Sequence, residues 1–352
     1  MAAGQVKIGN VTIGGGADIA VQSMTNSDTA DYNATLFQLM ELERVGCDIA
    51  RFTVPDMEAV RNIAKFKEKI NIPLVADIHF NYKLAIESAQ AGIDKIRINP
   101  GNIGSDDRIK AVCDICRQKK IPIRIGVNGG SLEKSILEKY SRPTPEALYE
   151  SALLNVKKLE RFDFNDIVIS VKSSDVVTMI KANRLLAHNT DYPLHIGVTE
   201  AGTTYGGIIK SSAGIGALLC DGIGDTVRVS LTADIKEEIR AAKELLMALG
   251  LKKNGIELVS CPTCGRCKIN LIEIADNFGK ILAEKNFKPN CRIKVAIMGC
   301  AVNGPGEARE ADVGVAGGAG DAILFKKGKI IGKIDADRII PTLLEEVENL
   351  CR

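Results

Sequence analysis

The chain has 352 residues, enough for two domains, and its 46 basic residues nearly balance 44 acidic ones, which excludes a broad basic surface for nucleic acid. Aromatic residues are only 4% and tryptophan is absent, which argues against a platform for stacking bases. No apolar run approaches the roughly 20 residues that span a bilayer, and the N-terminus lacks signal-peptide character, so we expect a cytoplasmic protein without membrane association.

From residue 19 to about residue 230, a short apolar strand, a loop and an amphipathic helical stretch recur in order. The predicted strands span residues 19–24, 48–54, 73–79, 94–100, 122–128, 166–172, 193–200 and 225–231. The predicted helices include residues 35–45, 57–69, 82–91, 144–162, 176–186 and 232–249. Eight such units favour an α/β fold with a (β/α)8 TIM barrel. The alternative is an open doubly wound sheet, but no GxGxxG motif opens a helix here.

A short segment, LKKNG at residues 251–255, follows the last barrel helix. After it the alternation of strands and helices gives way to a different pattern. The pattern predicts a Cys-rich segment, a helix over 271–285, a buried strand over 292–300, a glycine-rich turn, a hairpin over 322–334 and a helix over 336–350. We therefore expect a barrel over residues 1–250 and a smaller α+β domain over residues 256–352.

Charged residues occupy inward-facing positions near the ends of five predicted strands. Alternate residues of a barrel strand point inward, and barrel active sites lie at the C-terminal strand ends. The inward cations are Arg51, Arg97, Arg124, Lys172 and Arg228, accompanied by the polar residues Thr53, Asn99, Asn128, Ser170 and Ser230. One such arginine could equally form an ion pair inside the barrel.

Few carboxylates oppose these five cations at equivalent positions, namely Asp77 and Glu200. Buried cations without partners are costly, so an anionic ligand is expected to complete the set. The planar guanidinium group matches phosphate oxygens, which predicts a phosphate or diphosphate substrate. His79 and His195 could serve in acid–base chemistry or form hydrogen bonds at the barrel mouth. Glu200 could donate a proton or pair with an arginine.

Three cysteines, Cys261, Cys264 and Cys267, have CxxCxxC spacing, which is similar to the run that holds an iron–sulfur cluster. A structural zinc site or a redox dithiol is the alternative. Zinc usually requires a second close pair of ligands, and this domain has no histidine, so the spacing favours iron–sulfur. Cys300 ends a predicted strand at a glycine-rich turn, and Glu307 can return to the same point. Five other cysteines fall on apolar or surface positions of helices and strands and are expected to be structural: Cys47, Cys113, Cys116, Cys220 and Cys351.

Several segments together resemble the 4-hydroxy-3-methylbut-2-enyl diphosphate synthase family of the non-mevalonate isoprenoid pathway. They are ADIHF (76–80), IRINPGNIG (96–104), IRIGVNGGSLE (123–133), SVKSSD (170–175), GVTEAG (197–202), VRVSL (227–231), SCPTCGR (260–266) and MGCAVNGPGEA (298–308). The resemblance covers nearly the whole chain and is to the short two-domain form. It implies an oxidoreductase that reductively opens and dehydrates 2-C-methyl-D-erythritol 2,4-cyclodiphosphate.

The resemblance also implies a 4Fe–4S cluster, bound by Cys261, Cys264, Cys300 and, through its carboxylate, Glu307. An exchangeable carboxylate would leave room for a substrate oxygen at one iron. The implied diphosphate clamp consists of Arg51, Arg97, Arg124, Asn128, Lys172, Arg228 and Ser230, with Asp77 and His79 beside it and Glu200 as the proton donor. Flavodoxin or ferredoxin would supply electrons. Cys267, which many relatives lack, is expected to be a bystander.

A head-to-tail homodimer is expected, in which the cluster domain of one chain caps the barrel of the other. Both the short LKKNG segment and the resemblance suggest this arrangement. Two other functions remain open: a zinc-stapled, phosphate-binding aldolase or isomerase, in which Lys172 could form a Schiff base, and an iron-sensing regulator that binds RNA. Near-neutral charge and few aromatic residues argue against the regulator.

Overall fold

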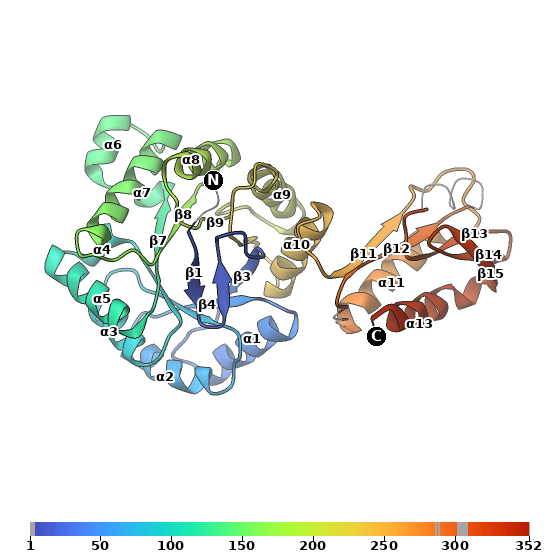
Figure 1. Ribbon diagram of the computed structural model, residues 1–352, viewed down its shortest axis with the longest axis horizontal. Helices are drawn as coiled ribbons and strands as arrows, with labels where there is room; N and C mark the ends of the chain where they lie inside the picture. Colours follow the sequence, from blue (N-terminus) through green and yellow to red (C-terminus); the bar gives the residue numbers. More distant parts are fainter. Residues whose placement is uncertain (1–3, 286, 288, 301–308, 352) are drawn as a thin grey trace. The chain divides into compact units, whose positions relative to one another are not determined.

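The computed structural model describes residues 4–285, 287, 289–300 and 309–351. It divides into two compact units, and the boundary lies between Leu245 and Leu246 (Figure 1). Among the described residues, no helix has the length and apolar character required to cross a membrane.

The first unit is a ring of eight parallel strands in the order β8-β7-β6-β5-β4-β3-β10-β9. A parallel bridge between Ile169 of β8 and Leu194 closes the ring, which confirms the predicted TIM barrel. The strands are β3 (Ala20–Met24), β4 (Ile49–Thr53), β5 (Leu74–Asp77), β6 (Lys95–Ile98), β7 (Ile123–Asn128), β8 (Ile167–Lys172), β9 (His195–Ile196) and β10 (Thr226–Val227).

The last two barrel strands are much shorter than the predicted ranges 193–200 and 225–231. Beyond Ile196 the chain leaves its neighbouring strand, and the backbone N–H of Thr199 instead donates to Ser173 O at 3.3 Å, in the loop after β8. Apolar residues continue past the point where strand pairing ends, so the sequence pattern overestimated the length of both strands.

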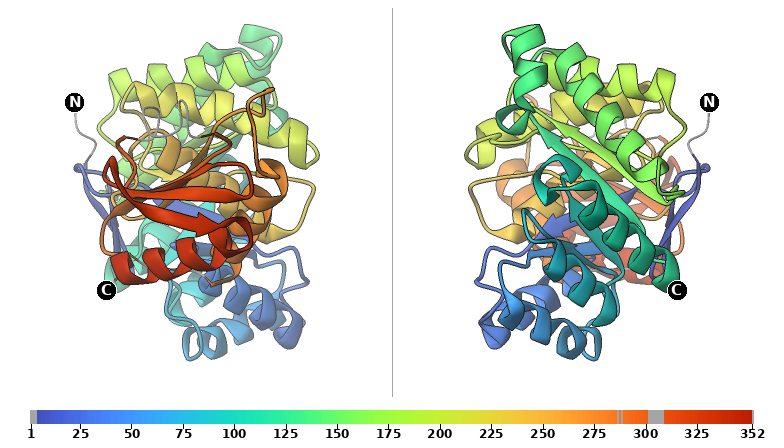
Figure 2. Two further views of the ribbon diagram at one scale, coloured as in Figure 1. Left: turned by 90° about the vertical axis from the view of Figure 1, so that its right-hand side faces the viewer. Right: turned by 90° about the vertical axis from the view of Figure 1, so that its left-hand side faces the viewer.

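Helices surround the barrel in chain order (Figures 1 and 2). They are α1 (Tyr32–Arg44), α2 (Met57–Lys67), α3 (Tyr82–Gln90), α5 (Asp106–Lys119), α7 (Pro145–Glu160), α8 (Val176–Asn189), α9 (Thr204–Cys220) and α10 (Ile235–Ala248). Asp31, Asp56 and Asp175 each accept a hydrogen bond from a backbone N–H in the first turn of the helix that follows. Shorter helices, α4 (Pro100–Ile103), η1 (Gly129–Ser131) and α6 (Lys134–Tyr140), lie in the loops after β6 and β7.

An antiparallel hairpin of β1 (Val6–Ile8) and β2 (Val11–Ile13) precedes the barrel. Its apolar side chains form one buried cluster with the first inward residues of β3, β4, β5 and β8, which are Ala20, Ile49, Val75 and Val168. The hairpin therefore closes the N-terminal end of the barrel with apolar side chains. Inward polar residues are left for the middle and the C-terminal end, which we call the mouth.

The second unit is a five-stranded sheet in the order β11-β12-β13-β14-β15. Its strands are β11 (Gly255–Ser260), β12 (Arg292–Met298), β13 (Val313–Gly317), β14 (Asp321–Lys326) and β15 (Lys329–Asp335), of which the first three are parallel. Helices α11 (Leu271–Lys285) and α13 (Ile339–Cys351), the latter preceded by η2 (Ala336–Arg338), pack on one face through a shared apolar core. The helices and the hairpin match the prediction, whereas β11 and β13 were not predicted as strands.

Candidate active site

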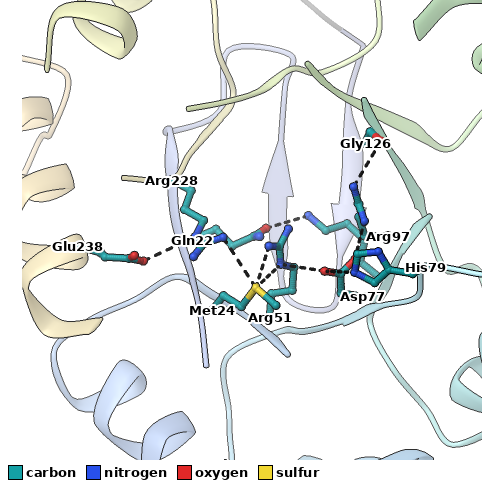
Figure 3. Close-up of polar contacts among 10 residues, drawn as sticks. Gln22, Met24, Arg51, Asp77, His79, Arg97, Gly126, Arg228 and Glu238 are labelled. Carbon is teal, nitrogen blue, oxygen red and sulfur yellow. Dashed lines mark hydrogen bonds and ion pairs between the residues drawn. The ribbon is translucent and has the colours of Figure 1, made fainter. Parts of the chain in front are cut away.

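Five cations lie inside the barrel near its mouth, as strand parity predicted. We call Arg51, Arg97, Arg124, Lys172 and Arg228 the cation cluster. Arg97 and Arg124 are register partners on β6 and β7. The exposed fractions of Arg97, Arg124 and Lys172 are 7%, 2% and 7%, so these charges have been taken almost completely out of water. Figure 3 shows how Arg51, Arg97 and Arg228 converge from different strands.

Asp77, at the end of β5, is the carboxylate that links two of these arginines. Arg97 Nη1 donates to Asp77 Oδ1 at 3.0 Å, and Arg51 Nε lies 3.8 Å from Asp77 Oδ2 (Figure 3). Burial by itself would raise the pKa of Asp77, but Arg51, His79 and Arg97 outweigh it and hold the pKa far below the ordinary value. Asp77 is therefore a permanent anion that positions cations.

A second carboxylate, Glu238 of α10, was not predicted. It is 5% exposed, accepts from Ser23 Oγ at 2.6 Å and from the backbone N–H of Leu231 at 2.9 Å, and lies 3.6 Å from Arg228 Nε. Glu238 thus ties Arg228 and the loop after β10 to β3. Glu200 was the second carboxylate expected to oppose the cations, but it is exposed and forms no ion pair with the described residues, whereas Glu238 opposes Arg228.

Met24, at the end of β3, also escaped prediction. Its Sδ accepts from Arg51 Nε at 3.1 Å and from Arg51 Nη2 at 2.7 Å, and Arg228 Nη1 lies 3.8 Å away (Figure 3). A thioether is a weak acceptor that carries no charge. Met24 therefore orients two guanidinium groups without neutralising either of them.

Arg124 is the least satisfied member of the cation cluster. Its Nε and Nη1 are buried and have no hydrogen-bond partner among the described residues. Burial, followed by repulsion from Arg51 and Arg97, lowers the pKa of Arg124 well below its ordinary value. Burial and repulsion from Arg228 do the same to the pKa of Lys172. This arrangement suits a bound anion, which would supply the missing acceptors and oppose the repulsion.

Four polar residues lie deeper, one inward step closer to the hairpin: Gln22, Lys95, His195 and Thr226. Lys95 and His195 are each 0% exposed. Lys95 Nζ donates to Gln22 Oε1 at 3.3 Å, and His195 Nδ1 lies 2.7 Å from Thr226 Oγ1. Burial, with repulsion from Arg124 and Lys172, lowers the pKa of His195 well below its ordinary value, so its imidazole is neutral. His195 is therefore an interior hydrogen-bonding residue and does not lie in the open mouth.

Two glycines make room for the cations. An added Cβ at Gly126 of β7 would overlap the guanidinium group of Arg97. An added Cβ at Gly197, just after β9, would overlap Arg228 O and lie 2.9 Å from Lys172 Nζ. Arg97 therefore lies against the backbone of Gly126, and Lys172 lies against that of Gly197. A larger residue at either position would occupy the space of the cation.

The remaining predicted residues surround the mouth. Asn128 is the register partner of Lys172, and Ser230, half-buried, follows Arg228 by two residues. The His79 side chain is 53% exposed and its Nε2 lies 3.6 Å from Asp77 Oδ2. Glu200 has a left-handed backbone, with φ of 52°, which is uncommon for a residue other than glycine and is often found at functional loops.

The predicted cluster cysteines lie at the ends of two neighbouring parallel strands. Cys261 follows β11 and Cys300 follows β12, and the backbone N–H of Gly299 donates to Cys261 Sγ at 3.2 Å. The backbone N–H of Lys268 donates to Gly299 O at 2.8 Å, which holds the turn containing Cys264 against the end of β12. Glu307, the fourth predicted ligand, lies outside the described residues.

The described cysteines are not arranged as a complete set of metal ligands. Within residues 4–285, 287, 289–300 and 309–351, no three His, Cys, Asp or Glu side chains are grouped closely enough to hold a metal ion. The third cysteine of the run, Cys267, donates through its Sγ to Ile269 O at 3.2 Å and packs against the core of the second unit. In the barrel, burial raises the pKa of the Cys47 and Cys113 thiols to about 12 each, which fits their predicted structural role.

Comparison with known proteins identifies the family of the chain. Residues 3–243 match the GcpE TIM-barrel domain, and residues 257–349 match the GcpE protein C-terminal domain. A protein of Ruminiclostridium cellulolyticum, named 4-hydroxy-3-methylbut-2-en-1-yl diphosphate synthase (flavodoxin), is 54% identical over 98% of this chain and 97% of its own length. A protein of the same name from Clostridium perfringens is 55% identical over 98% of both chains.

Solved structures show a likeness in the barrel. N-acetylneuraminic acid synthetase from Leptospira borgpetersenii has a TM-score of 0.50 and 12% identity, over 71% of this chain and 91% of its own. A truncated 3-deoxy-D-arabino-heptulosonate 7-phosphate synthase from Thermotoga maritima has a TM-score of 0.50 and 14% identity, over 71% and 94%. At such low identity these structures support the fold alone. The two domain matches and the relatives above half identity show that the chain belongs to the GcpE family.

Proposed function

We propose that the chain catalyses the reductive ring opening and dehydration of 2-C-methyl-D-erythritol 2,4-cyclodiphosphate to 4-hydroxy-3-methylbut-2-enyl diphosphate. The observation that carries the proposal is the cation cluster, centred on the unsatisfied and buried guanidinium group of Arg124. The names of the relatives supply the product, and a site for a diphosphate is what the chemistry of that product requires.

The charge change of this reaction suits the site. Two electrons and one proton enter, one carbon–oxygen bond to the cyclic diphosphate breaks, and one hydroxyl leaves as water. The cyclic diphosphate carries two negative charges, whereas the open diphosphate carries three when fully ionised. Asp77 and Glu238 leave most of the charge of the cation cluster uncompensated, so negative charge that develops during ring opening is stabilised.

Each residue of the mouth has a proposed role. Arg51, Arg97, Arg124, Lys172 and Arg228 bind the phosphoryl oxygens. Asn128 and Ser230 add neutral hydrogen-bond donors beside Lys172 and Arg228. Asp77 holds Arg97 and Arg51 in place, with His79 at its outer side. Glu200, exposed on the loop after β9, donates the proton to the leaving hydroxyl group.

The second unit is proposed to hold a 4Fe–4S cluster through Cys261, Cys264, Cys300 and Glu307. The three described ligands are cysteines at the ends of β11 and β12 and in the turn after β11, which suits iron–sulfur chemistry, and Gly299 N–H already donates to one of these sulfurs. When bound, the cluster would supply electrons one at a time. Flavodoxin is the proposed electron donor, because the relatives carry that word in their names, with ferredoxin as the alternative.

Two further proposals concern the assembled enzyme. The barrel unit and the cluster unit have to meet for electrons to reach the substrate, and we propose a head-to-tail homodimer in which each barrel is completed by the partner. We also propose that the enzyme works in the cytoplasm, where thiols stay reduced.

The test is metal analysis and turnover of anaerobically purified protein. About four iron and four sulfide per chain are expected, together with product formation from the cyclic diphosphate and reduced flavodoxin. Stoichiometric zinc without sulfide would contradict the cluster and favour the zinc-stapled barrel. Iron and sulfide without binding of the cyclic diphosphate would contradict the assigned substrate.

A further inference from the structure

Lys95 is a buried amine that the reaction described above does not use. It lies on β6 two residues before Arg97, one inward step closer to the closed end of the barrel. Its exposed fraction is 0%, and among the described residues the hydrogen-bond partner of Nζ is the neutral Gln22 Oε1, at 3.3 Å. No carboxylate in the described chain forms an ion pair with it.

The charges that act on Lys95 Nζ are of its own sign. Arg124 on β7 and Arg51 on β4 repel a charge on its Nζ, and His195 on β9 is a third basic group of the same interior. The nearby carboxylates are already engaged: Asp77 on β5 with Arg97 and Arg51, and Glu238 on α10 with Ser23 and Arg228. A buried ammonium group surrounded in this way is costly, whereas a neutral amine is not.

An anion in the cation cluster reverses this balance. A bound diphosphate opposes the charges of Arg124 and Arg51, which are the two groups that repel a charge on Lys95. We propose that Lys95 is uncharged in the unliganded protein and takes up one proton from solvent when a diphosphate binds, becoming a sixth cation beneath it. This inference rests on the proposed function and names a residue that tunes the charge of the same site.

The proposal has a defined pH dependence. Ligand binding raises the pKa of Lys95 from its depressed unliganded value, so one proton is taken up at pH values between the two. Over that range affinity for the diphosphate falls about tenfold for each unit of rising pH, in addition to any other linked group. Burial, and then repulsion from Arg124 and Arg51, lowers the pKa of Lys95 well below its ordinary value before the ligand arrives.

Calorimetry of the anaerobic holoenzyme with the cyclic diphosphate tests the proposal. Titrations at one pH in buffers of different ionisation enthalpy give the number of protons taken up. We expect Lys95→Met to lower that number by about one relative to the wild type, because a single titratable amine is removed. Lys119→Met, a change at an exposed lysine of α5, serves as the matched control and should leave it unaltered.

A second readout separates this role from simple packing. Folding of the unliganded protein has to release the proton that Lys95 carries in the unfolded chain, so Lys95→Met should raise the melting temperature at neutral pH. The same variant should weaken diphosphate binding and flatten its pH dependence. Lys95→Gln provides the same test if the Met variant does not fold. His195→Asn tests a second buried base of the same interior. If proton uptake falls by about one in His195→Asn and is unchanged in Lys95→Met, the assignment to Lys95 is overturned.

The outcomes separate the two proposals. Unchanged proton uptake in Lys95→Met, with diphosphate still bound, contradicts the role of Lys95 and leaves the proposed function intact. Absence of any binding by the wild-type holoenzyme contradicts the proposed function, and the role of Lys95 fails with it.

Discussion

The guanidinium group of Arg97 lies across the backbone of Gly126 on the neighbouring strand, in space that a side chain there would occupy. Arg97 Nη2 also donates to Gly126 O at 3.4 Å. Any side chain at position 126 would therefore require the guanidinium group of Arg97 to shift from its place between Asp77 and β7. The geometry of the proposed anion site therefore depends on the absent side chain at position 126 as well as on the cations.

Gly126→Ala should displace Arg97 and weaken binding of the cyclic diphosphate by about 1–3 kcal/mol, because the charged hydrogen bond of Arg97 to Asp77 is strained or lost. Calorimetric binding measures the effect. Gly216→Ala on α9, where an added Cβ would make only an ordinary contact, is the control. Wild-type affinity in Gly126→Ala would show that the position of Arg97 is not what the site requires.

Arg124→Met should abolish tight diphosphate binding without lowering the melting temperature of the unliganded protein. The guanidinium group is buried and two of its nitrogens have no partner, so its removal costs the empty fold little. The loss of binding should be about 2–5 kcal/mol, as for a desolvated charge pair that loses one member. Arg184→Met, at an exposed arginine paired with Asp221, should change neither quantity. A large loss of stability in Arg124→Met would instead make Arg124 a structural residue.

Asp77→Asn should destabilise the unliganded protein by about 3–5 kcal/mol at neutral pH, because it leaves Arg97 and Arg51 buried without a counter-charge. The pKa of Asp77 is lower in the folded state than in the unfolded state. Its contribution is therefore fully present above the unfolded value, about 3.9, and is lost as the pH falls towards the folded value.

Melting temperatures measured from pH 7 downwards check this prediction. The difference between the wild type and Asp77→Asn should be constant down to about pH 5 and shrink below about pH 4. Asp114→Asn, at an exposed carboxylate paired with Arg117, should show almost no difference at any pH. A difference that persists unchanged at low pH would mean that the charge of Asp77 is not what stabilises the barrel.

Cys267→Ala should retain about four iron and four sulfide per chain, whereas Cys261→Ala, Cys264→Ala and Cys300→Ala should each lose them. The reason is that Cys267 Sγ is engaged with Ile269 O and the apolar core, while Cys261 Sγ accepts from Gly299 N–H at the strand end. Anaerobic metal and sulfide analysis decides this. Loss of the cluster in Cys267→Ala would show that Cys267 is a ligand in place of one of those assigned. It would not contradict the presence of a cluster in the wild type.

Mixing two inactive variants tests the head-to-tail homodimer. Arg124→Ala damages the barrel site, and Cys300→Ala damages the cluster site. If each site is shared between chains, every mixed dimer has one undamaged site, and random pairing at equal amounts restores about a quarter of full activity. If each chain completes its own site, every site carries one lesion and mixing restores nothing. Subunit exchange has to be demonstrated in the mixture. If the subunits exchange and no activity is restored, the shared site of the dimer is contradicted.

Much of the site followed from strand parity, because inward positions in a barrel recur at every second residue. Parity placed Arg51, Arg97, Arg124 and Lys172 correctly, and the structure confirms it. The same parity puts Lys95 on the face of Arg97, so that residue could have been found from the sequence, although it lies deeper than the mouth. Its depth was not visible because strand ends cannot be located to better than a few residues.

Met24 and Glu238 could not be predicted in the same way. A methionine at a strand end is ordinary core, and nothing in its type indicates that two arginines will donate to its sulfur. Glu238 lies on a helix, where strand parity does not apply, and reaches Ser23 of β3 across 215 residues of sequence. Strands β11 and β13 were missed for a related reason: they contain glycine at Gly255, Gly314 and Gly317, which weakens the strand signal.

The β1–β2 hairpin makes the two ends of the barrel different, because it covers one end with apolar side chains. Val6, Ile8 and Ile13 form a buried apolar cluster with barrel residues at the end opposite the mouth, so within the described residues the polar approach to the interior lies on the side of the cation cluster. A proton or water that reaches Gln22, Lys95 or His195 from the mouth passes the cation cluster, where we propose that the diphosphate binds. A bound diphosphate would then obstruct this approach, so the proton that Lys95 takes up on binding would stay in the interior until the product leaves.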